Sequence, residues 1–273
     1  MISFKKRNET LDFSRAVNIC HGIWWVGFQD SEGLRCNPYL IVEGDEAVLI
    51  DGGSRPDFPV VMMKVLETGL NPKNISALIY DHHDPDLCGS IPNLEEMIAN
   101  PDLVLISSGF SNVFIRHYGS MSKFVNVADI GNKFTFKTGR TLEFIDTPYC
   151  HTRGSFVVFD SQSKVLFSAD IFGTYQNDLE LFYTFPPDCG KENACESCRE
   201  KDKCELPGYL DFHRTVMPSS KAVRHSMKRL KELPFELVAP QHGSILDRHS
   251  ADILIEKLAS LDDIGIDQIF HGE

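Results

Sequence analysis

The sequence has no long apolar run and fewer basic than acidic residues. No stretch approaches the roughly 20 apolar residues that a helix needs to span a bilayer, so we expect no membrane association. Lys5, Lys6 and Arg7 are not followed by an apolar segment, which argues against a secretory signal peptide. The 27 Lys and Arg against 39 Asp and Glu leave a formal charge of −12. A negative field of this size repels phosphate backbones and disfavours a nucleic-acid-binding protein.

The composition is that of a globular protein. Hydrophobic residues make up 42% and charged residues 24% of the 273, which excludes a disordered chain, a collagen and a coiled coil. The length suits one large domain or two small ones. Without an export signal we expect a cytoplasmic protein. Its eight cysteines would then be thiols or metal ligands rather than disulfides.

Short apolar runs predict strands and amphipathic stretches predict helices, in two comparable halves of the chain. The predicted strands are 23–28, 39–42, 47–50, 77–80 and 103–106 in the first half, and 141–145, 155–159, 164–168 and 237–239 in the second. The predicted helices are 59–68, 92–99, 220–233 with Ser219 as its N-cap, and 251–261. This pattern favours a single α/β domain over residues 1–273, with sheets inside and helices outside.

His and Asp residues gather where predicted strands end. The segment 81–86 (Asp-His-His-Asp-Pro-Asp) directly follows one strand, and His151, Asp170 and His242 each follow another. Side chains at the carboxyl ends of strands are exposed where sites are commonly built. A single loop of this kind is more often a solvated turn, but four such positions in one chain favour a metal site.

These residues resemble the ligand motif of a known family. The sequence resembles the metallo-β-lactamase superfamily, and within it the diiron domain of flavodiiron proteins and their stand-alone oxygen-binding relatives. The motif His-x-Glu-x-Asp-His, followed by a small residue and Gly, matches residues 82–89 (His-His-Asp-Pro-Asp-Leu-Cys-Gly), and the later His, Asp and His match His151, Asp170 and His242. The family-like segments 37–41, 49–51, 166–173 and 216–218 extend the likeness over nearly the whole chain. The family's C-terminal flavodoxin domain has no counterpart in these 273 residues.

The resemblance implies a four-layer αββα sandwich that holds two metal ions. The implied ligands are His82, Asp84, His151 and Asp170 for the first metal, and Asp86, His242 and the shared Asp170 for the second. Asp84 replaces the usual Glu, and Leu87, which cannot bind metal, stands where the superfamily's hydrolases have a His. The second metal would therefore keep open positions for water or a diatomic gas. Oxygen-rich ligation suits two iron ions, with manganese or zinc as alternatives.

The leading functional hypothesis is a non-haem diiron protein that binds or reduces O2 or NO. It would act as an oxygen sensor or as a reductase fed by a redox protein partner. The alternative is a metal-dependent hydrolase such as a phosphodiesterase, so whether the protein is an enzyme stays open. Tyr149 and Tyr175 are candidate proton donors, or else packing aromatics. A homodimer is compatible with the resemblance, although a chain without flavin lacks its relatives' reason to pair.

A polar segment at residues 186–207 interrupts the pattern, and we interpret it as an insertion. It contains Cys189, Cys195, Cys198 and Cys204, spaced Cys-x5-Cys-x2-Cys-x5-Cys. Four thiolates can close a tetrahedron around zinc, and an iron–sulfur cluster, free thiols or a redox disulfide are the alternatives. An iron–sulfur cluster here would supply electrons to the diiron site. The remaining cysteines are expected to be core or strand residues (Cys20, Cys36) or to pack beside the ligand loops (Cys88, Cys150).

Overall fold

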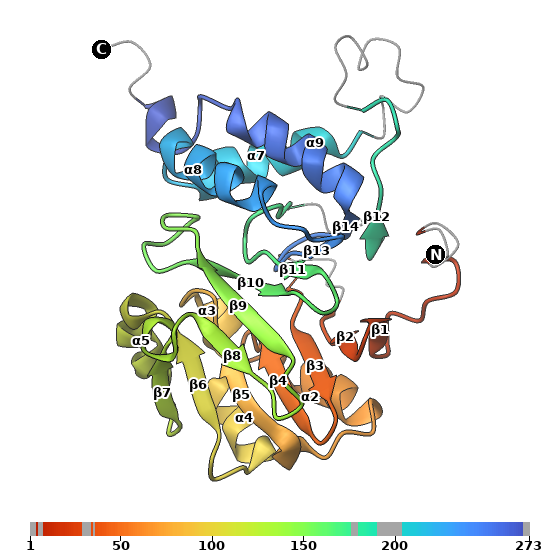
Figure 1. Cartoon of the computed structure of the whole chain (residues 1–273), viewed down its shortest axis with the longest axis vertical. Helices are drawn as coiled ribbons and strands as arrows, with labels where there is room; N and C mark the ends of the chain where they lie inside the picture. The colour runs from red at the N-terminus through yellow and green to blue at the C-terminus, as the bar shows by residue number, and fades with distance from the viewer. Residues whose placement is uncertain are drawn as a thin grey trace.

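The computed structural model describes residues 4, 8–28, 34, 36–175, 180–189 and 204–269. Within these ranges the chain forms two seven-stranded sheets that pack face to face, with helices on both outer faces (Figure 1). This is the four-layer αββα arrangement that the sequence predicts. In the described part of the chain no helix is long and apolar enough to cross a bilayer.

The first sheet has its strands in sequence order. They are β1 (Val17–Cys20), β2 (Ile23–Trp25), β3 (Tyr39–Glu43), β4 (Glu46–Ile50), β5 (Ile75–Ile79), β6 (Val104–Ser107) and β7 (Lys123–Asn126). Strands β1 to β4 pair antiparallel and β4 to β7 pair parallel. Parallel neighbours need crossover connections. These contain the helices α2 (Phe58–Glu67), α3 (Pro85–Cys88), α4 (Ile91–Ile98) and α5 (Gly109–Ile115), with the 3₁₀ turns η1 (Pro72–Asn74) and η2 (Arg116–Tyr118).

The second sheet has the order β12, β14, β13, β11, β10, β9, β8. Its strands are β8 (Lys133–Thr135), β9 (Thr141–Asp146), β10 (Phe156–Asp160), β11 (Val165–Phe167), β12 (Phe182–Tyr183), β13 (Leu237–Ala239) and β14 (Ile245–Asp247). The helices α7 (Leu206–Val216), α8 (Ser220–Lys231) and α9 (Arg248–Ala259) cover its outer face (Figure 1). The 3₁₀ turns η3 (Val127–Ile130) and η5 (Ile266–Gln268) complete the elements.

Three apolar layers hold the sandwich together. One lies between the sheets and one lies under the helices on each outer face. Side chains alternate between layers along a strand, so Val48 and Ile50 of β4 face the other sheet while Ala47 and Leu49 face the helices. Such strands are buried on both faces, which explains why they read as continuous apolar runs in the sequence.

Every predicted strand and helix overlaps an element of the structure. Ser219 caps α8 as expected, because its side chain accepts a hydrogen bond from the backbone N–H of Ala222. The predicted insertion is only partly described, since Cys195 and Cys198 lie outside the described residues. Cys189 and Cys204, at its two edges, are partly buried against the apolar layer under α7, α8 and α9. Helix α7 begins at Leu206, within the last residues of that segment.

A buried ion-pair network joins the two sheets at one end. The Arg140 guanidinium, at the start of β9, donates to the Asp160 carboxylate at the end of β10 through both Nε and Nη2. Its Nη1 lies 2.9 Å from Oε2 of Glu43, at the end of β3, and 2.8 Å from the carbonyl oxygen of His21. Asp160 belongs to the second sheet and the other two acceptors to the first, so a single side chain fastens the sheets together.

We expect the Asp160→Ala variant to lose about 3–5 kcal/mol of unfolding free energy, because it leaves the Arg140 charge buried without its main partner. Chemical denaturation measures this as a lower midpoint at unchanged slope. The matched control is Glu236→Ala, which breaks the exposed Lys164–Glu236 pair and should cost little. Equal losses in the two variants would contradict the role given to Arg140.

Candidate metal centre

The six predicted metal ligands lie just after four strands, five of them in loops and Asp86 in the first turn of α3. His82, Asp84 and Asp86 follow β5, and His151, Asp170 and His242 follow β9, β11 and β13 respectively. Strands β11 and β13 are parallel neighbours, so the loops after them begin at the same edge of the second sheet. The structure brings all six side chains together across the gap between the two sheets.

The first group of donors gathers around the carboxylates of Asp84 and Asp170. Nε2 of His151 lies 3.0 Å from Oδ2 of Asp84 and 3.1 Å from Oδ2 of Asp170. Nε2 of His82 lies 4.0 Å from Oδ2 of Asp84 and 3.8 Å from Oδ1 of Asp170. One donor atom each from His82, Asp84 and His151 lie within 4.8 Å of one another, which is close enough to share an ion.

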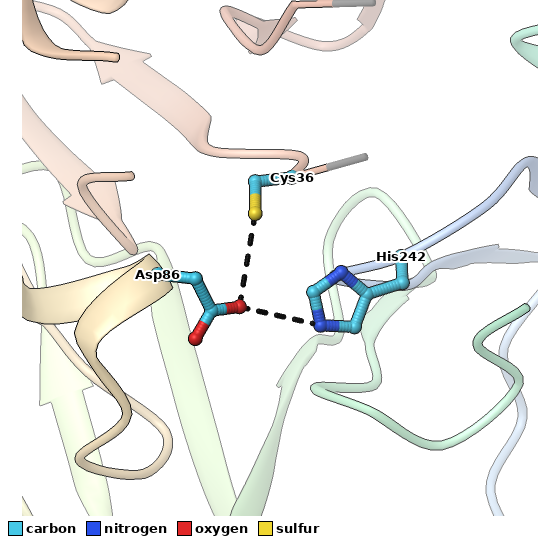
Figure 2. Close-up of side chains that lie close together, drawn as sticks. All are labelled: Cys36, Asp86 and His242. Carbon is cyan, nitrogen blue, oxygen red and sulfur yellow. Dashed lines mark hydrogen bonds and ion pairs between the residues drawn. The ribbon is translucent and has the colours of Figure 1, made fainter. Parts of the chain in front are cut away.

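The second group contains a residue that the sequence did not indicate. Donor atoms of Asp86, His242 and Cys36 lie within 4.8 Å of one another, and Figure 2 shows the three side chains converging from separate segments. Nε2 of His242 lies 3.4 Å from Oδ2 of Asp86 and 3.4 Å from Oδ1 of Asp170. Asp170 therefore lies between the two groups, with Oδ2 close to His151 and Oδ1 facing both His242 and His82, a position that suits a bridging carboxylate.

The chemistry of this cluster suits a pair of divalent cations. His82, Asp170 and His242 are at most 2% exposed, and the buried Oδ1 atom of Asp170 has no hydrogen-bond partner. Carboxylates packed together away from water are costly unless positive charge compensates them. Imidazole and carboxylate donors together suit iron, manganese or zinc. The residues present thus fit two metal ions joined by Asp170, and the assignment of each ligand stays a prediction.

Mutual electrostatic interactions shift the pKa values of these groups. Burial opposes the charged imidazole, but Asp170 and Asp81 outweigh it and raise the pKa of His82 to about 9. Asp170 and Asp84 likewise overcome burial and raise the pKa of His151 to about 10. Burial also opposes ionisation of Asp170, yet the neighbouring imidazoles hold its pKa well below the usual range. A metal ion that binds these imidazoles therefore displaces protons from them.

Asp81 orients the first imidazole. Its Oδ1 atom lies 2.6 Å from Nδ1 of His82, and both side chains are buried. A hydrogen bond at Nδ1 leaves Nε2 directed into the cluster, the usual arrangement of a metal-binding His and its outer carboxylate. The sequence alone does not identify this partner, although Asp81 is the residue directly before His82 in the motif.

A second histidine holds the loop that carries Asp170. Nε2 of His213, on α7, accepts a hydrogen bond of 3.1 Å from the backbone N–H of Phe172, and Nδ1 lies 2.7 Å from the carbonyl oxygen of Tyr209. Burial lowers the pKa of His213 to about 4, so the ring is neutral at neutral pH. Ala169 and Phe172, on either side of Asp170, have left-handed backbone angles (φ 54° and 67°). Strain of this kind persists only where surrounding contacts enforce it.

The remaining predicted positions lie around the cluster. Tyr149 and Tyr175 are about half exposed, and the ring of Tyr175 packs on Phe212 at 4.9 Å between centroids. The Phe212 ring lies 5.8 Å from that of His242, so Tyr175 is near the second group through one intervening aromatic residue. The proton-donor role of both tyrosines stays a prediction. Leu87 is fully buried in the apolar layer under α2 and α4.

The sequence predicts that Cys36 is a core or strand residue. The residue is indeed buried (3% exposed), but it precedes β3 and its Sγ atom lies 3.7 Å from Oδ2 of Asp86. Burial raises the pKa of its thiol to about 11. The sequence offered little signal for this position, because the proximity of Cys36 to His242 comes from contacts between opposite ends of the chain.

Known proteins match most of the chain. The profile of the family described as "ODP family beta lactamase" matches residues 34–243. Two solved structures of one protein have a TM-score of 0.74 at 23% identity: "Peroxy diiron species of chemotaxis sensor ODP", aligned over 94% of this chain and 98% of that one, and "Apo state of chemotaxis sensor ODP from T. denticola", over 94% and 97%. Together with the family match, this similarity shows the metallo-β-lactamase-like fold.

Curated relatives are longer than this chain. "Putative diflavin flavoprotein A 2" of Synechocystis is 26% identical over 225 residues, which are 82% of this chain and 36% of the relative. "Anaerobic nitric oxide reductase flavorubredoxin" of Vibrio vulnificus is 23% identical over 259 residues, or 89% and 49%. The chain thus spans less than two thirds of the length of the curated relatives that it matches.

We expect Asp170→Ala to lose both metal ions and His242→Ala to lose mainly the second, because Asp170 faces both donor groups and His242 faces one. Metal content per chain after anaerobic reconstitution with ferrous iron measures this. His225→Ala is the matched control, since His225 lies exposed on α8. Full metal content in Asp170→Ala would exclude the bridging role.

Asp81→Ala should weaken metal binding by about 10–100-fold, because it removes the hydrogen bond that orients His82 and leaves the donor atoms in place. Competition with a chelator of known affinity gives the dissociation constants of variant and parent. An unchanged affinity would mean that Asp81 does not position the ring.

Proposed function

The chain belongs to the ODP family of β-lactamase-like domains, and on this premise we propose that it is a non-haem diiron protein that binds O2. The observation that carries the proposal is the shared carboxylate, because Asp170 lies between the two donor groups, within 4 Å of His82 and His151 of the first and of His242 of the second. In this proposal His82, Asp84 and His151 hold the first iron, and Asp86 and His242 hold the second. When bound, a pair of ferrous ions supplies open positions for a diatomic gas and electrons to reduce it.

The protein's own residues prepare the site in three ways. Asp81 fixes the orientation of His82, and His213 fixes the loop that carries Asp170 by its hydrogen bond to Phe172. Burial of His82, Asp170 and His242 strengthens the electrostatic interactions among these three side chains. The hydroxyl of Tyr175 is the candidate proton donor near the second group, held by the contact of its ring with Phe212.

An oxygen-sensing role has the most direct support. The structures of the chemotaxis sensor ODP match 94% of this chain and nearly all of their own chain, and one of them is described as a peroxy diiron species. The diflavin and flavorubredoxin relatives match over part of their length only. Reduction of O2 or NO over repeated cycles would require a redox protein partner to return electrons. A reductase role therefore includes such a partner in the proposal.

The test is an anaerobic-to-aerobic optical titration of protein reconstituted with ferrous iron. We expect about two irons per chain and an absorbance change on addition of O2, lost in Asp170→Ala and kept in His225→Ala. A parallel sample with NO distinguishes the two gases. A protein that keeps zinc and turns over a phosphodiester, or that holds iron without any response to O2, would overturn the proposal, and the first result would favour the hydrolase.

A further inference from the structure

The second donor group contains a cysteine, Cys36, in addition to the predicted ligands Asp86 and His242. Cys36 lies three residues before the first residue of strand β3, and its Sγ atom is 3.7 Å from Oδ2 of Asp86 (Figure 2). One donor atom from each of Cys36, Asp86 and His242 lies within 4.8 Å of the other two, and the same holds for the three residues of the first group. The buried Oδ1 atom of Asp170, which has no hydrogen-bond partner, lies 3.4 Å from Nε2 of the same His242.

The next residue holds Cys36 firmly beside the His242 loop. The fully buried Asn37 donates from its backbone N–H to the carbonyl oxygen of Gln241 at 2.9 Å. Its Nδ2 donates to the carbonyl oxygens of Pro240 and Gly243 at 3.0 and 2.9 Å. Its Oδ1 accepts from Nε1 of Trp25 at 2.8 Å. These bonds run to both sides of His242, so Cys36 is positioned by the same network that positions the imidazole, as a preorganised ligand should be.

The donor set of the second group is short without this thiol. Asp86, His242 and the shared Asp170 supply one nitrogen and two oxygens, and Leu87 packs away in the apolar layer under α2 and α4. A cysteine close to a cation is deprotonated and becomes a strong ligand. A fourth donor would complete the tetrahedral number that zinc and related ions prefer.

We propose that Cys36 is a thiolate ligand of the second metal position. The proposal rests on the dinuclear site proposed above, but not on iron or on O2. It makes the two positions chemically different, with nitrogen and oxygen donors at the first and an added sulfur donor at the second. The second position therefore prefers ions that accept sulfur, such as Co²⁺, Zn²⁺ and Fe²⁺, over Mn²⁺.

The test is a titration with Co²⁺ alone under anaerobic conditions, because a thiolate bound to cobalt gives a charge-transfer band in the near ultraviolet. Cys189, Cys195, Cys198 and Cys204 could also bind cobalt, so every variant is made in a background of Cys195→Ser and Cys198→Ser. We expect the band in this background, its loss in Cys36→Ala, and a weakening of the second cobalt by at least about tenfold. Cys20→Ala, at the end of β1 and outside both donor groups, should keep the band.

A second measurement covers the case in which Cys36→Ala fails to fold. X-ray absorption on the zinc-loaded background protein should show a sulfur scatterer at about 2.3 Å. A band that survives Cys36→Ala, or a zinc spectrum without sulfur, would overturn the proposal. Both readouts are independent of the O2 titration. A Cys36-dependent band in a protein that does not respond to O2 would contradict the O2-binding function and support Cys36 as a ligand. A protein that responds to O2 but has no Cys36-dependent band would support the O2-binding function and contradict Cys36 as a ligand.

Discussion

The structure depends on one electrostatic constraint, which is that acidic and imidazole side chains are crowded together inside the protein. Asp170 is at the centre of this crowding, buried and within 4 Å of His82, His151 and His242. Such a cluster is tolerated only where opposite charges alternate or cations compensate. The two packed sheets must therefore hold in place every loop that contributes a side chain to the cluster around Asp170.

The sheets and a few buried polar contacts together fix the loops of the candidate metal centre. The first sheet supplies the loop after β5 and the second sheet supplies the loops after β9, β11 and β13. Arg140 fastens the two sheets to each other at one end. Asn37 and His213 then fix the His242 and Asp170 loops by hydrogen bonds to backbone atoms.

The sequence predicted the central strands and the principal helices because burial on both faces produces an unbroken apolar run. It missed β1, β7, β8, β12 and β14, which are short or half-exposed and carry no clear period. It also missed the short helices α3 and α5, and α7, which begins inside the polar insertion. The six ligand candidates were found because each follows a strand and matches a family motif. Cys36 was not identified as a ligand candidate, because its proximity to the His242 loop exists only in the folded chain.

The hydrogen bond between His213 and Phe172 has a mechanical consequence. Phe172 is two residues from Asp170, and His213 is a neutral, fully buried ring on α7, one of the helices on the outer face. Helix α7 and Asp170 are thus linked through one hydrogen bond and two residues of backbone. Any shift of the Asp170 loop relative to α7 would therefore have to break this hydrogen bond or carry the helix with it.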